Sequence, residues 1–169
     1  MIKKNIMNKY AVIAIFAGTI LLIVVLISSK TGSQQDQIVP TSSGKLEITE
    51  ERFDFGTISM ADGNVSYAFT VKNVGPEEVI LSKLFTSCMC TKATLKIGDK
   101  KFGPFGMPSH VAIPTIRAIL SPQETAEVEA VFDPNAHGPA GVGKIERVVT
   151  LENNAGEPVV FEFSAMVTP

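Results

Sequence analysis

The eight residues from 65 to 72 point most clearly to the fold: Val65-Ser66-Tyr67-Ala68-Phe69-Thr70-Val71-Lys72. Their larger apolar side chains occupy every second position, and smaller or polar side chains lie between them. Successive side chains of a β-strand point to opposite faces of its sheet. This period of two therefore predicts a strand with one buried face and one solvent face.

The same alternation recurs toward the C-terminus, in residues 126–132 and 159–167. Residues 78–86 are more continuously apolar, which predicts a strand covered on both faces. Residues 145–151 form another candidate strand. If Ile145 points into the interior, Arg147 does so too, unless it lies at an edge, snorkels, or is displaced by a bulge.

Turn residues separate these runs, for example Ala61-Asp62-Gly63-Asn64 and Asn153-Asn154-Ala155-Gly156. We expect an all-β fold, an immunoglobulin-like antiparallel β-sandwich of about seven strands. Residues 98–115 contain three Gly and three Pro, and we expect them to form a long loop. The predicted core is Phe53, Phe55, Tyr67, Phe69, Ile80, Leu84, Val128, Phe132, Val149, Leu151, Phe161 and Phe163.

An uncharged apolar run precedes the predicted sandwich, Tyr10 to Ile27, long enough to cross a bilayer as one helix. Three Lys precede it and one follows, which predicts a cytoplasmic N-terminus. A cleaved signal peptide is the alternative. The expected organisation is a cytoplasmic N-terminus (1–9), a transmembrane anchor (10–28), a flexible tether (29–44) and the β-sandwich (45–169).

Charge is distributed unevenly along the chain. Residues 1–30 carry four Lys and no acid, whereas residues 31–169 carry 11 Lys and Arg against 17 Asp and Glu, and 11 − 17 = −6. An acidic domain lacks the basic surface that nucleic acids require, so we expect no nucleic-acid partner. The predicted location is extracytoplasmic, either periplasmic or at the cell surface, on a single-pass membrane protein.

Both cysteines lie in one short motif, Ser87-Cys88-Met89-Cys90-Thr91. Three interpretations stay open. The pair is structural, with or without a disulfide that requires a turn at Met89. Alternatively, the two thiolates bind a soft metal ion, or the pair exchanges between dithiol and disulfide.

Further soft ligands support the metal hypothesis. The predicted loop supplies Met107 and His110, and a second Gly/Pro loop supplies His137. A set of Cys88, Cys90, Met107, His110 and His137 suits copper better than zinc. The folded part contains no Gly-x-Ser-x-Gly and no His-Glu-x-x-His motif. We therefore expect no enzymatic activity and name no catalytic residue.

Five motifs occur in a fixed order along residues 46–168, and together they resemble the bacterial domain-of-unknown-function family 1573. That family is similar to the ASH/Hydin and major-sperm-protein group. The resemblance implies an exported immunoglobulin-like domain and no established activity. Met89 departs from the family, which usually has Gly there. The motifs are Phe53-Asp54-Phe55-Gly56-Thr57-Ile58, Phe69-Thr70-Val71-Lys72-Asn73-Val74-Gly75, Ser87-Cys88-Met89-Cys90-Thr91, Leu120-Ser121-Pro122 and Ala130-Val131-Phe132-Asp133.

The expected function is that of a membrane-anchored binding or scaffold domain with a protein partner in the cell envelope. Copper binding and thiol–disulfide exchange are the two alternatives, and both would use Cys88 and Cys90.

Overall fold

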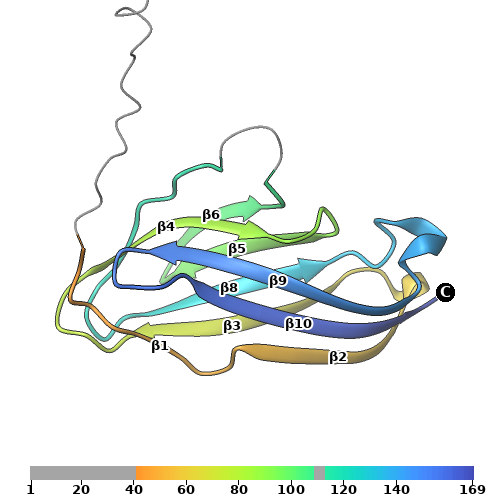
Figure 1. The fold of residues 1–169 in the computed structure, drawn as a ribbon, viewed down its shortest axis with the longest axis horizontal. Coiled ribbons are helices and arrows are strands. Elements are labelled where there is room, and N and C mark those ends of the chain that lie inside the picture. The colour runs from red at the N-terminus through yellow and green to blue at the C-terminus, as the bar shows by residue number, and fades with distance from the viewer. Residues whose placement is uncertain (1–40, 109–112) are drawn as a thin grey trace, which may run out of the picture. The chain divides into compact units, whose positions relative to one another are not determined.

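The computed structural model describes residues 41–108 and 113–169. This part of the chain folds into two five-stranded sheets (Figure 1). One sheet has the order β1-β3-β8-β5-β6 and the other β2-β10-β9-β4-β7. The strands are β1 (Leu46–Ile48), β2 (Arg52–Ser59), β3 (Val65–Asn73), β4 (Val79–Thr86), β5 (Thr91–Ile97), β6 (Lys100–Phe105), β7 (Ala118–Leu120), β8 (Thr125–Phe132), β9 (Gly143–Asn153) and β10 (Val159–Thr168).

Two short 3-10 helices complete the described elements, η1 (Met60–Asp62) and η2 (Gly138–Gly141). Among residues 41–108 and 113–169, no helix is long and apolar enough to cross a membrane. The predicted anchor, residues 10–28, lies outside the described residues, as do residues 1–9 and most of the predicted tether.

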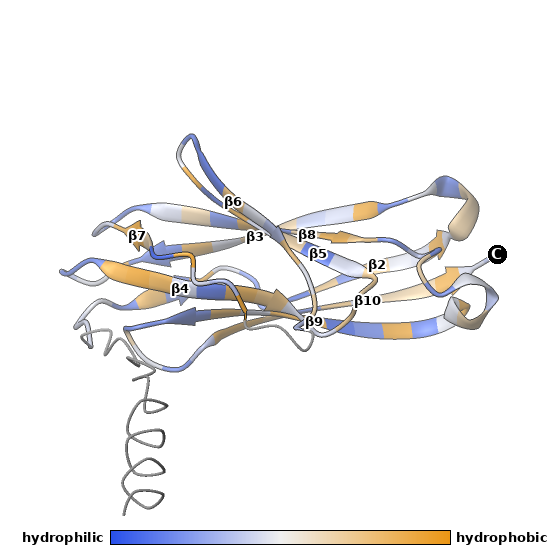
Figure 2. Cartoon of the chain, turned by 90° about the horizontal axis from the view of Figure 1, so that it is seen from above, coloured by the Kyte–Doolittle hydropathy of each residue, from blue (hydrophilic) through white to orange (hydrophobic). Residues whose placement is uncertain are grey.

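The alternating apolar side chains of the sequence point into the space between the two sheets. β3 and β10 place every second side chain in the interior, and Figure 2 shows hydrophobic and hydrophilic residues alternating along the strands. Aromatic rings join the two sheets: Phe69 of β3 stacks on Phe161 of β10, with ring centroids 4.8 Å apart. The all-β prediction is confirmed, although the described residues form ten strands rather than about seven. The expected antiparallel pairing holds except between β2 and β10, which are parallel.

Most of the predicted core is buried, with one error. Phe53, Phe55 and Tyr67 are partly buried and pack against the core, but Ile80 does not belong to it. In β4 the inward side chains are those of Val79 and Leu81, and a register shift follows Leu81. Alternation therefore holds in β4 on either side of this shift, and the expected cover on both faces is partial, because the second face is half-buried.

The segment expected to be a long loop contains a strand. β6 pairs with β5 in an antiparallel hairpin, and Pro104 lies within it. Proline lacks the N–H that a central strand must donate, but β6 is the edge of its sheet and pairs on one side only. Because β6 is an edge strand, it can contain a proline, and the prolines had led us to expect a loop here.

Two motifs that carry the family resemblance have structural roles. Gly56 lies within β2 with a φ of +68°, where the register with β10 shifts, and its N–H donates to Asp54 Oδ1 at 3.0 Å. That hydrogen bond, followed by one from Ser164, lowers the pKa of Asp54. Gly75 lies so close to the backbone of Gly44 and Lys45 that a Cβ would collide with it. A glycine is therefore required at position 75 for the chain to enter β1.

Candidate functional site

The Ser87–Thr91 motif forms the turn by which the chain passes from one sheet to the other. β4 ends at Thr86 in the second sheet, and β5 begins at Thr91 in the first. Thr91 N donates to Cys88 O at 3.2 Å, and the buried Thr86 Oγ1 lies 3.0 Å from the same oxygen. Ser87 N donates to Val148 O at 2.9 Å, which ties the turn to β9. These bonds fix the backbone that carries both cysteines.

Cys88 and Cys90 are joined by a disulfide. On an extended strand, the Cα atoms of two residues that are two positions apart lie about 6.6 Å from each other. The turn at Met89 shortens that separation to 5.2 Å, within the range that disulfides adopt. The predicted need for a turn is therefore met. Cys88 and Cys90 are 8% and 3% exposed, whereas Met89 between them is 62% exposed.

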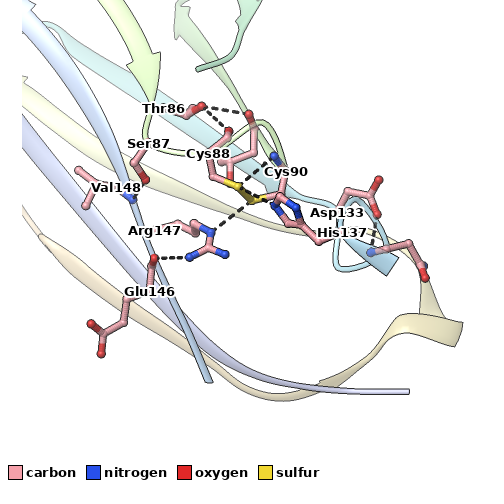
Figure 3. Close-up of a disulfide and its surroundings, with 11 residues drawn as sticks. Thr86, Ser87, Cys88, Cys90, Asp133, His137, Glu146, Arg147 and Val148 are labelled. Atoms are coloured by element: carbon pink, nitrogen blue, oxygen red, sulfur yellow. Dashed lines mark hydrogen bonds between the residues drawn. A yellow bond between two sulfur atoms is a disulfide. The ribbon is translucent and has the colours of Figure 1, made fainter. Parts of the chain in front are cut away.

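Two cationic or potentially cationic side chains contact the sulfur atoms from different elements (Figure 3). His137, which precedes η2, places Nε2 3.3 Å from Cys88 Sγ. Arg147 of β9 donates from Nε to Cys90 Sγ at 3.2 Å and from Nη1 to Glu146 O at 2.8 Å. Cys88, Cys90 and His137 offer three ligand atoms that lie within 4.8 Å of one another.

Arg147 occupies an inward position of β9, in phase with the buried Ile145 and Val149. No salt bridge of the described part of the chain involves Arg147. The carboxylate next to it in sequence, Glu146, instead pairs with Lys144 at 2.7 Å, and this contact lowers the pKa of Glu146. The half-buried guanidinium therefore has no anionic partner among the described residues. An anionic sulfur at Cys90 would supply one.

The structure brings together part of the predicted ligand set. Cys88, Cys90 and His137 converge. The carbonyl of Gly106 accepts from Thr86 N at 3.2 Å. Met107 follows Gly106, and the Met107 side chain is 47% exposed. His110 lies outside the described residues.

The sequence placed Arg147 in phase with Ile145 but left open an edge position, snorkelling or a bulge, and it assigned Arg147 no partner. The signal was present, because a charge at an inward strand position requires a polar contact. The partner atom, Cys90 Sγ, reaches Arg147 only because the turn between β4 and β5 carries the chain from one sheet to the other.

Solved structures with similar folds are only distantly related in sequence. A protein of unknown function from Porphyromonas gingivalis W83 is 15% identical with a TM-score of 0.55, covering 79% of this chain. The chain spans about half of that protein, 51% of its length. A family 123 glycoside hydrolase from Clostridium perfringens is 8% identical with a TM-score of 0.50, and the match covers 74% of this chain and 27% of the hydrolase. These likenesses concern the fold alone.

The ASH/PapD-like domain of human CEP192 is 16% identical, with a TM-score of 0.46, and the match covers 82% of this chain and 96% of that domain. No curated protein matches the chain in sequence. A family model, described as protein of unknown function (DUF1573), matches residues 46–101. This range holds β1 to β5 and the Ser87–Thr91 turn. The resemblance to family 1573 is thus confirmed, since residues 46–101 of the chain match the model of that family.

Proposed function

We propose that the chain is a non-catalytic binding or scaffold domain of the cell envelope, with an immunoglobulin-like sandwich. The immunoglobulin-like assignment is supported by the way in which the chain changes sheets. β1 pairs with β3 in one sheet, and β2, three residues later, pairs with β10 in the other. One side of the sandwich is thereby covered by a single continuous segment, and the opposite side lies between the edge strands β6 and β7.

The observation that carries a binding role is a groove of about 530 Å³ on that opposite side. Edge strands expose backbone N–H and C=O groups, to which an extended segment of another protein can add as a further strand. β7 is only three residues long, and its Ile119 is 53% exposed. The groove is lined by Ile97, Lys100, Phe102, Arg117, Ala118, Ile119, Ser121 and Glu124.

The proposed occupant is an extended segment of an envelope protein that carries apolar and acidic side chains. Ile119 and Phe102 offer apolar surface, and Lys100 and Arg117 offer positive charge. The single carboxylate in the lining belongs to Glu124, which accepts from Ser121 N at 2.8 Å. Specificity would come from alternate side chains of the added strand.

A photo-activated cross-linking residue at position 119, in cells that make the full chain, is expected to give a defined protein adduct. Position 166 provides the matched control, because Met166 on β10 is 46% exposed but does not line this groove. An adduct that is equally strong from both positions, or absent from both, would contradict the proposed site. Adding an Ile119→Asp substitution beside the cross-linker should weaken the adduct.

We further propose that residues 10–28 anchor the chain, with residues 1–9 in the cytoplasm and the sandwich outside. The Lys asymmetry around the apolar run supports this orientation. A protease added to intact cells, after the outer membrane is opened where one exists, should digest an epitope tag placed after Pro169. Protection of the tag until the inner membrane is lysed would refute the orientation.

A second candidate function is thiol–disulfide exchange at Cys88 and Cys90, and Arg147 is the observation that favours it. The guanidinium 3.2 Å from Cys90 Sγ would stabilise a thiolate, the anionic form that takes part in exchange. Equilibration of the folded chain with glutathione redox buffers, followed by alkylation of free thiols, measures the reduction potential. A pair that stays oxidised until the chain unfolds would rule this candidate out.

A further inference from the structure

We propose that reduction of the Cys88–Cys90 disulfide creates a binding site for one Cu(I) ion, formed by Cys88 Sγ, Cys90 Sγ and His137 Nε2. The inference rests on the second candidate function, because the disulfide must be reducible in the folded chain. It goes beyond that function in assigning a ligand and in excluding the ligand from the oxidised state.

The geometry requires only a local adjustment. In a three-coordinate site with metal–sulfur bonds of about 2.3 Å and angles near 120°, the two sulfurs lie roughly 4.0 Å apart. Breaking the disulfide lets the sulfurs separate by side-chain rotation while the turn at Met89 keeps both cysteines on one side. His137 Nε2 is already 3.3 Å from Cys88 Sγ, and the three ligand atoms lie within 4.8 Å of one another.

Charge favours a monovalent ion over a divalent one. Two thiolates and Cu(I) carry a net charge of −1, and the Arg147 guanidinium beside Cys90 Sγ would balance it. Two thiolates and Zn²⁺ carry no net charge, so the half-buried Arg147 would stay without an anionic partner. Thiolate ligands also suit soft Cu(I), and imidazole binds copper as well.

The surroundings allow an ion to enter and then be shielded. Cys88 and Cys90 are almost fully buried, whereas His137 is exposed and lies in the loop before η2 (Figure 3). An ion could reach His137 first and pass to the sulfurs beneath it. Arg147 contacts Cys90 Sγ from β9, whereas His137 contacts Cys88 Sγ from the loop before η2.

The chemistry balances in two steps. A dithiol reductant gives two electrons and two protons to the disulfide; the protein S–S bond breaks, two thiols form, and the reductant becomes a disulfide. Cu(I) delivered by a small thiol carrier then replaces the two thiol protons, which go to solvent, and the metal keeps its oxidation state. Exchange with a disulfide oxidant, which would take up the two electrons and become two thiols, would return the sulfurs to the disulfide and release Cu(I).

The test uses the full chain in detergent micelles, reduced by a phosphine that is removed before Cu(I) is titrated against a chromogenic Cu(I) chelator. We expect one Cu(I) per reduced chain and none on the oxidised chain. Cys88→Ser/Cys90→Ser should lower the affinity at least about 100-fold. His137→Ala should lower it about 10-fold or more, since even loss of an outer-shell partner costs 10–100-fold. X-ray absorption should show two sulfurs and one nitrogen around copper.

His110→Ala is the matched control, because it removes the other histidine of the chain and should leave the affinity unchanged. Equal binding by the oxidised chain or by the double serine variant would overturn the proposal. So would a loss in His110→Ala as large as in His137→Ala, or displacement of Cu(I) by equimolar Zn²⁺. A count of free thiols after reduction separates the two proposals: thiols without copper binding refute only the copper site, and absence of thiols refutes both.

Discussion

Replacing Asn73 with Ala is expected to lower the free energy of unfolding by about 3 kcal/mol, because three backbone groups lose their partner and two of these hydrogen bonds are buried. The Asn73 side chain is fully buried at the end of β3. Its Nδ2 donates to Glu77 O at 2.7 Å and to Leu120 O at 3.0 Å, and its Oδ1 accepts from Gly75 N at 3.0 Å. It therefore joins the β3–β4 turn to β7, in the opposite sheet.

Asn153 provides a matched control within the same chain. Like Asn73, it bonds to the backbone four and two residues ahead: Asn153 Nδ2 donates to Glu157 O at 3.0 Å, and Oδ1 accepts from Ala155 N at 2.8 Å. Asn153 is only partly buried, so water can replace its bonds. We expect Asn153→Ala to cost about 1 kcal/mol. Urea unfolding of residues 41–169 followed by circular dichroism measures both values, and an equal loss in the two variants would contradict the role given to Asn73.

Arg147→Met is expected to make the Cys88–Cys90 disulfide harder to reduce. Hydrogen bonds to charged groups contribute about 1.5–3 kcal/mol, and partial exposure of Arg147 places its effect at or below the low end. The dithiol form would lose about 1.4 kcal/mol relative to the disulfide, a tenfold change in the equilibrium, or about 30 mV toward more negative potential. The sign follows from charge: Arg147 stabilises an anionic thiolate more than a neutral disulfide.

Lys144→Met controls for net charge, because it removes one positive charge from the same strand at a residue paired with Glu146. Its reduction potential should stay within about 10 mV of the unsubstituted chain, a third of the tenfold shift. Arg147→Lys should fall between the two, since it keeps the charge but loses the planar fork. An unchanged potential in Arg147→Met would remove the main support for a reversible pair.

Strands with a clear period of two were predicted well from the sequence. Residues 65–72 lie within β3 and residues 126–132 within β8, because alternation is written into each strand separately. Ile80 was wrongly assigned to the core because, in a continuously apolar run, the sequence does not show which alternate side chains point inward. The strand β6 was missed because a proline is excluded only from central strands, and the edge position of β6 depends on the order of the whole sheet.

The candidate site shows the same division. The sequence alone identified the cysteine pair, the turn needed at Met89 and the inward phase of Arg147. It offered three further ligands and favoured Met107 and His110 over His137. Only the folded chain brings His137 and Arg147 to the sulfurs, across separations of 49 and 57 residues along the chain.

By itself, the sequence determined the all-β class, the phase of the regular strands and the motif that holds both cysteines, because each depends on neighbouring residues and a local repeat. The tertiary structure alone decided which strands became edges, that His137 meets the cysteines and which atom accepts from Arg147. Those outcomes depend on how two sheets pack and cross, and a local pattern does not contain that information.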